Sequence, residues 1–141
     1  MKDKVLIRVK SETYSGEAGD CLEINYIGEI SRVNGNIYVQ YEEMTEGESR
    51  MTKNLVKIYP DKGCVEITKR GPITAHMEFC TGQRTHTFYE TPFGAVNMGI
   101  YTREADIDAS GESIKILLDY SIESNYQIVS ECRVSMEIKG S

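Results

Sequence analysis

The sequence predicts an all-β protein, an antiparallel meander closed into a barrel of about eight to ten strands. Three observations favour this fold. Apolar and polar residues alternate in segment after segment, no stretch keeps a helical apolar period for three turns, and Gly, Asn, Pro or Asp regularly interrupts the pattern. A meander with one apolar face is stable when closed, because closure removes exposed strand edges. A two-sheet sandwich is the alternative architecture.

The first elements are a strand over residues 4–10 and a hairpin around Asn34-Gly35. Asn-Gly favours a type I′ turn, whose two central residues both take positive φ. A two-residue loop there pairs Ile30 with Val39 and Gly28 with Tyr41. One apolar face then collects Leu22, Ile24, Tyr26, Gly28, Ile30, Ile37, Val39 and Tyr41.

The next strand spans residues 51–59 and leads into Pro60-Asp61-Lys62-Gly63. This segment suits a type I turn closed by a left-handed glycine. It sets Ile58 opposite Val65 and Val56 opposite Ile67.

Gly82-Gln83 fits a type II′ loop, which would place Phe79 opposite His86 and Met77 opposite Phe88. A further strand is expected over residues 94–103.

A three-residue loop around Asn125 pairs Ile122 with Ile128, Leu118 with Cys132, Ile116 with Val134 and Ile114 with Met136. In each predicted hairpin the apolar positions fall on one side of both strands. A slip of one residue would turn them all to solvent, so this agreement supports the assignment.

Length and composition predict a single domain over residues 1–141, with 40% hydrophobic and 27% charged residues. The net charge of −6 argues against nucleic acid or an anionic membrane as partner, because both require clustered basic residues. Without an apolar export segment, we expect a cytoplasmic protein whose four cysteines are reduced and mostly buried.

Several segments occur in a characteristic order. They are Tyr41-Glu42-Glu43, Arg70-Gly71, Met77-Glu78-Phe79, Thr91-Pro92-Phe93-Gly94 and 98–102, followed by Gly111 and Tyr120. In this order and spacing the chain resembles the YwiB-like family, small bacterial β-barrel proteins of uncharacterised function, from about residue 4 to residue 138. The resemblance implies a calycin-like barrel related in shape to lipocalins. It carries over no catalytic or binding residue.

Polar residues fall on the predicted inner face. One interpretation is a cavity with polar anchors for a small ligand. The other places the two glutamates at strand ends that meet solvent, with tyrosines capping the core through their hydroxyls. The candidate ligand-binding residues are Tyr26, Tyr41, Glu43, His86, Glu90 and Tyr120, with Thr102 on the same face. The Thr91-Pro92-Phe93-Gly94 turn is either the rim of a ligand mouth or simply a rigid turn.

No metal site, cofactor or catalytic constellation is predicted. His76 is expected on the face opposite His86, and His76 and Cys80 are about 13 Å apart along an extended strand. His86 and Glu90 are as far apart, so an acid–base pair would need a sharp bend. We therefore expect a binding protein and not an enzyme.

The first hypothesis for function is a cytosolic barrel that binds a small, partly apolar molecule in its interior. The alternative is a structural or interaction protein that uses an outer-surface patch of Met51, Leu55 and Tyr59, for example as a homodimer.

Overall fold

The computed structural model describes residues 3–44, 47–125 and 127–140. These residues form ten antiparallel strands and no helix. The strands are β1 (Asp3–Ser15), β2 (Ala18–Val33), β3 (Asn36–Met44), β4 (Met51–Tyr59), β5 (Cys64–Arg70), β6 (Ala75–Cys80), β7 (Arg84–Thr91), β8 (Gly94–Asp108), β9 (Ile114–Ser124) and β10 (Gln127–Gly140).

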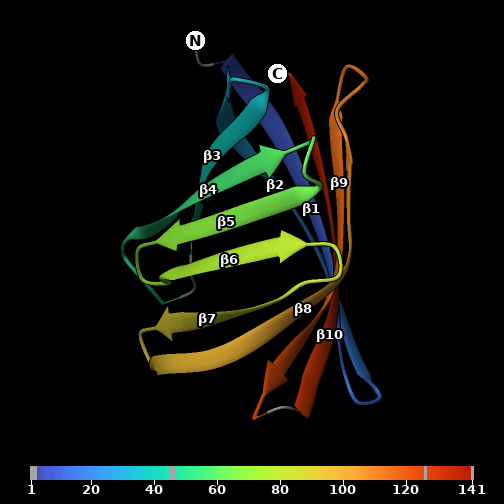
Figure 1. Ribbon diagram of the computed structural model, residues 1–141. Helices are drawn as coiled ribbons and strands as arrows, with labels where there is room; N and C mark the ends of the chain where they lie inside the picture. The colour runs from blue at the N-terminus through green and yellow to red at the C-terminus, as the bar shows by residue number, and fades with distance from the viewer. Residues whose placement is uncertain (1–2, 45–46, 126, 141) are drawn as a thin grey trace.

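All ten strands belong to one sheet in the order β6-β5-β4-β3-β2-β1-β10-β9-β8-β7. The first and last strands pair, with Val5 opposite Gly140, so the two ends of the chain lie side by side (Figure 1). The sheet curls until its two edge strands, β6 and β7, face each other. The result is the nearly closed all-β barrel that the alternation predicted, consistent with a calycin-like barrel and not with a sandwich.

The boundary between β6 and β7, called the seam below, is where closure is incomplete. The two strands form no ladder among the described residues, and a single isolated bridge joins Thr74 to Glu90. Side chains supply further links. Thr87 Oγ1 donates to the carbonyl oxygen of His76 over 2.7 Å, and Thr85 Oγ1 donates to that of Glu78 over 3.2 Å. Threonine hydroxyls on β7 thus satisfy carbonyls that a regular ladder would have paired.

The Asn34-Gly35 hairpin has the predicted register. Ile30 lies opposite Val39 and Gly28 opposite Tyr41, and both turn residues have positive φ, 53° and 83°. Gly28 is required by packing, because an added Cβ would lie 2.3 Å from the carbonyl oxygen of Gln40. A glycine there allows β2 and β3 to approach each other closely.

The turn after β4 is also confirmed. Ile58 lies opposite Val65 and Val56 opposite Ile67. The amide of Gly63 donates to the carbonyl of Tyr59 over 3.0 Å, and Gly63 has a φ of 65°.

Beyond its first few pairs, the β9–β10 hairpin keeps the predicted faces but not the predicted partners. Leu118 lies opposite Val134 and Ile116 opposite Met136, two positions away from the expected register. The ladder starts at Gln127 opposite Ser124, and an irregularity between Ile128 and Ser130 shifts it further. From Ser130 onward the shift is even and leaves the side chains on their predicted faces. Next to the turn it is odd, so Ile128, predicted opposite Ile122, lies opposite Glu123 and is 61% exposed.

The predicted β6–β7 register is wrong. The turn is centred on Thr81-Gly82, because the Gln83 amide donates to the Cys80 carbonyl and Gly82 has a φ of 79°. Pairing with β8 sets the orientation of β7, so that Thr87 is buried and Phe88 is 64% exposed. At the isolated bridge Thr74 lies opposite Glu90, one residue from its predicted partner Thr91. This odd shift turns each β7 side chain predicted to face inward toward the outside.

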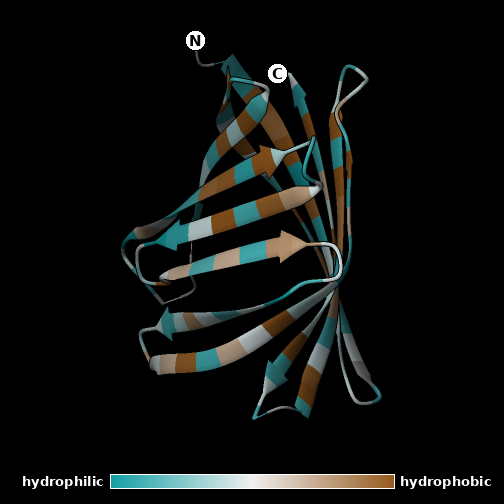
Figure 2. Cartoon of the chain, in the orientation of Figure 1, coloured by the Kyte–Doolittle hydropathy of each residue, from teal (hydrophilic) through white to brown (hydrophobic). Residues whose placement is uncertain are grey.

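The core lies inside the barrel, and apolar and polar bands alternate along most strands in Figure 2. Its fully buried members come from both halves of the chain and include Ile7, Val39, Ile58, Phe79 and Ile100. Ile30 and Leu118 are buried as predicted.

The expectation of four reduced cysteines is wrong for one pair. Cys64 and Cys80 occupy directly opposed positions of β5 and β6, with Cα atoms 4.4 Å apart, and form a disulfide. Cys21 is free and exposed, whereas Cys132 is free and buried. Within the described ranges, no helix has the length and apolarity needed to cross a membrane.

Candidate functional site

A cavity of about 220 Å³ lies inside the barrel. Leu22 and Ile24 line it and are 58% and 37% exposed, although they share the inward face of β2 with Tyr26. Their exposure indicates that solvent reaches the cavity at this end. The wall consists of Val9, Ser11, Leu22, Ile24, Tyr26, Tyr41, Glu43, Ile67, Lys69, Met77, Phe79, Leu118, Tyr120, Val134 and Met136.

A charge pair lies in the cavity wall. Lys69 Nζ is 2.6 Å from Glu43 Oε1 and donates to Asn54 Oδ1 over 2.8 Å. Only 14% of the Lys69 side chain and 21% of that of Glu43 remain exposed. Partly buried charges are tolerated when they are paired and hydrogen-bonded, and both conditions hold here. Next to the pair, Asn54 Nδ2 is buried with no hydrogen-bond partner among the described residues.

The sequence pattern predicted Glu43 on the inner face, but Lys69 was not predicted there. The sequence does contain a signal for this position. Val65 and Ile67 point inward, so alternation along the strand predicts that Lys69 points to the same side. A lysine at the end of a short strand is usually expected to face solvent, which is why its interior position was not predicted.

Tyrosine side chains stand around the charge pair. The rings of Tyr26 and Tyr41 have centroids 4.6 Å apart, and burial together with the Glu43 carboxylate raises the pKa of both phenols. Burial and, second, Glu43 also raise the pKa of Tyr89. These phenols are therefore protonated at neutral pH, and each carries one hydroxyl proton to donate.

A second aromatic pair lines the cavity. The ring centroids of Phe79 and Tyr120 are 4.8 Å apart. Burial is the main cause that raises the pKa of Tyr120, followed by Cys132 beside it. The cavity is thus lined by two pairs of aromatic rings and one charge pair.

The structure brings four of the six predicted site residues to this cavity: Tyr26, Tyr41, Glu43 and Tyr120. His86 and Glu90 are exposed and do not line it. Their inward placement was wrong because it depended on the β6–β7 register. Thr102 is fully buried, as predicted.

The Thr91-Pro92-Phe93-Gly94 turn joins β7 to β8. Thr91 Oγ1 accepts from the Phe93 amide over 3.1 Å and donates to the Gly94 carbonyl over 2.9 Å. The Phe93 side chain is fully exposed. These bonds stiffen the turn, and they account for it without a ligand.

A groove of about 660 Å³ lies on the outer surface. It is lined by residues of β1 to β5 that include Ile27, Met51 and Leu55. Met51 and Leu55 belong to the outer patch predicted from the sequence, whereas Tyr59 lies outside the groove.

Comparisons with known proteins agree with this fold. Residues 7–136 match a family described as a domain of unknown function, DUF1934. The crystal structure of the ywiB protein from Bacillus subtilis superimposes with a TM-score of 0.87 at 19% sequence identity, covering 99% of this chain and 93% of that one. No curated protein matches the sequence.

Proposed function

The chain belongs to the DUF1934 family, and we propose that it is a cytoplasmic binding protein whose barrel interior holds a small, partly apolar molecule. The observation that carries this proposal is the Lys69–Glu43 pair in the wall of an otherwise apolar and aromatic cavity. A few fixed polar groups among apolar side chains are typical of small-molecule sites.

The cavity limits the size and charge of the ligand. Its volume of about 220 Å³ is below the roughly 300 Å³ at which pockets for drug-sized molecules begin. A dry cavity of about 150 Å³ accommodates benzene. Because Lys69 and Glu43 neutralise each other, a ligand with a net charge would gain little from the pair. A neutral ring-sized molecule with one or two hydrogen-bonding groups fits best.

We infer binding and not catalysis. The tyrosines around the cavity hold their protons at neutral pH, so they serve as hydrogen-bonding groups and not as bases. His86 and Glu90 are exposed on β7, away from the cavity.

The test uses phenol and benzene as probes and heteronuclear NMR titration as the measurement. We expect phenol to bind more tightly than benzene, because only phenol hydrogen-bonds to the polar wall. Val134→Phe fills the cavity and should abolish binding of both. Val33→Phe is the matched control, since Val33 is exposed at the end of β2. Native mass spectrometry of protein purified without refolding checks for a copurified ligand.

Two outcomes would overturn the proposal. One is the absence of any copurified molecule together with no shift for either probe. The other is equal binding by the Val134→Phe and Val33→Phe variants, which would place the probes outside the cavity.

The second candidate function is self-association through the outer surface. It is favoured by exposed apolar residues beside the groove: Leu6 and Ile27 lie directly opposite each other and are 40% and 73% exposed. Sedimentation velocity of the protein and of Ile27→Lys tests it. A dimer that the lysine dissociates would support the interaction role, and a monomer at all concentrations would reject it.

A further inference from the structure

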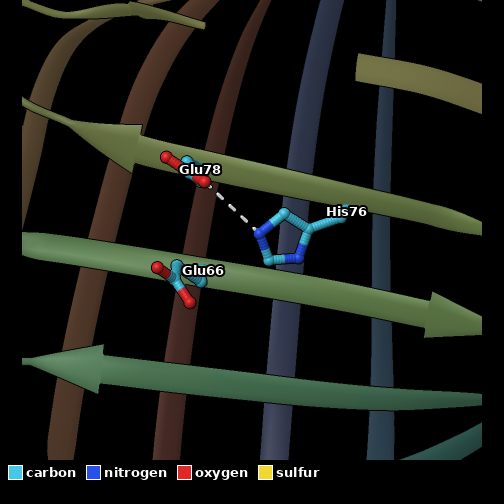
Figure 3. Close-up of side chains that lie close together, drawn as sticks. All are labelled: Glu66, His76 and Glu78. Atoms are coloured by element: carbon cyan, nitrogen blue, oxygen red, sulfur yellow. Dashed lines mark ion pairs between the residues drawn. The ribbon is translucent and has the colours of Figure 1, made fainter. Parts of the chain in front are cut away.

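Three side chains with metal-binding atoms meet on the outer face of β5 and β6. One ligand atom each from Glu66, His76 and Glu78 lies within 4.8 Å of the other two. Figure 3 shows the imidazole of His76 directed toward Glu78, with Glu66 on the neighbouring strand. His76 Nε2 is 3.4 Å from Glu78 Oε1. The cluster is separate from the interior cavity, because alternation puts it on the other side of the sheet.

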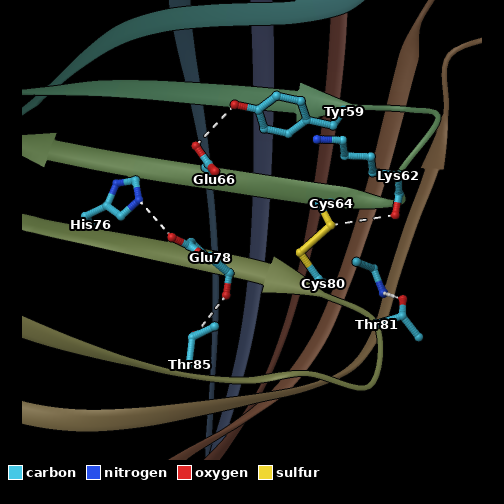
Figure 4. The surroundings of a disulfide bond; sticks show 10 residues. Tyr59, Lys62, Cys64, Glu66, His76, Glu78, Cys80, Thr81 and Thr85 are labelled. Atoms are coloured by element: carbon cyan, nitrogen blue, oxygen red, sulfur yellow. Dashed lines mark hydrogen bonds and ion pairs between the residues drawn. A yellow bond between two sulfur atoms is a disulfide. The ribbon is translucent and has the colours of Figure 1, made fainter.

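The register of two paired strands positions these residues. Glu66 lies directly opposite Glu78, and Thr68 lies opposite His76. The next pair along the same face is the Cys64–Cys80 disulfide, which ties the strands together (Figure 4). Like charges opposite each other on neighbouring strands repel, so this arrangement is favoured by a cation between them.

Neighbouring groups orient the candidate ligands. Thr68 Oγ1 is 2.9 Å from His76 Nδ1, which leaves Nε2 as the nitrogen that faces the carboxylates. The Tyr59 hydroxyl donates to Glu66 Oε2 over 3.3 Å. Metal-binding histidines and carboxylates are typically held by such outer hydrogen bonds.

Lys57 is the basic residue closest in register. It lies opposite Glu66 on β4, and no ion pair joins the two in the described part of the chain. The carboxylates of Glu66 and Glu78 are thus available to a cation.

We propose that Glu66, His76 and Glu78 bind a divalent transition-metal ion of the zinc class. One imidazole and two carboxylates suit such an ion, and the two carboxylates balance its charge. Two ligand atoms about 2.1 Å from a tetrahedral zinc are roughly 3.4 Å apart, the distance already found between His76 and Glu78. Glu66 closes the site by a side-chain rotation, and water occupies the remaining position.

A metal site at this position would contradict the expectation of no metal. The sequence predicted no metal because His76 was expected on the face opposite His86 and too far from Cys80 along one strand. Glu66 joins from the adjacent strand.

The experiment is isothermal titration of Zn²⁺ into oxidised Cys21→Ser protein, because the exposed Cys21 thiol would itself bind zinc. We expect one ion per chain. His76→Ala should weaken Zn²⁺ binding at least tenfold, and Thr68→Val, which removes the outer hydrogen bond, about tenfold. The chain has two histidines, so His86→Ala is the matched control and should bind as the parent does.

Circular dichroism and thermal unfolding without metal verify that each variant is folded. If Glu66→Gln and Glu78→Gln are folded, each should also weaken binding. The proposal is overturned if the parent protein does not bind Zn²⁺, if His76→Ala binds as tightly as the parent, or if His86→Ala loses as much affinity as His76→Ala.

Discussion

The Lys69–Glu43 pair places two opposite charges in the cavity wall. Replacing Lys69 with Met leaves the Glu43 carboxylate in the wall without its partner. We expect a loss of about 2–3 kcal/mol in the free energy of unfolding, below the cost for a fully buried pair because both side chains retain some exposure. Urea denaturation measures the loss.

The double variant Lys69→Met/Glu43→Leu is the control for this prediction. It removes both charges and should be more stable than Lys69→Met alone, because no unpaired carboxylate remains. If the double variant is less stable than the single one, the ion pair is not what stabilises this wall.

Sequence patterns predicted some residues of the cavity wall correctly and others not. Tyr26, Tyr41 and Glu43 were placed correctly because the Asn-Gly turn between β2 and β3 fixes their register locally. The inward position of Lys69 also follows from the alternation of inward and outward residues along β5. The Asn54 Nδ2 group, which has no hydrogen-bond partner among the described residues, was not predictable, because its surroundings depend on how strands distant in sequence pack together.

At the scale of elements, turn chemistry decided which strands were predicted correctly. The turn at Gly63 has the glycine in the position that the sequence indicated, and β4 and β5 follow in register. At Gly82 the same residue serves as the third turn position, not the second, and beyond the turn the Thr74–Glu90 bridge lies one residue away from the predicted pairing. The β7 sequence could not correct this, because it has an aromatic residue on each face, Phe88 and Tyr89.

The disulfide between β5 and β6 should contribute measurably to stability. It closes a loop with a sequence separation of 16, for which chain entropy gives about 3 kcal/mol. We expect a reductant to lower the urea midpoint of the protein accordingly. Cys64→Ser/Cys80→Ser should start at the reduced midpoint and not respond to reductant.

An unchanged midpoint on reduction would contradict this prediction. The result also bears on the proposed compartment, because thiol pools of the cytoplasm keep most cysteines reduced. In the cytoplasm, the relevant free energy of unfolding would be that of the reduced protein.

At the scale of the whole molecule, closure is a property that the sequence left open between barrel and sandwich. The hairpins are local, but the curl that brings β6 to β7 arises from the accumulated twist of all ten strands. The two sides of the barrel consequently differ. Strand β1 is paired with both β2 and β10 along most of its length, whereas β6 and β7 share one bridge and the two threonine hydroxyl bonds.

The seam should therefore be the part of the barrel that opens most readily. Hydrogen-exchange mass spectrometry should show faster exchange in β6 and β7 than in β1, because opening there breaks few backbone hydrogen bonds. Thr87→Val removes the hydroxyl that donates to His76 at nearly unchanged volume. One lost hydrogen bond of about 1 kcal/mol corresponds to roughly fivefold faster exchange, confined to β6 and β7. Thr87→Ser keeps the hydroxyl and should leave the rates unchanged. Uniform acceleration across the barrel in Thr87→Val would instead mean that the seam opens only when the whole molecule unfolds.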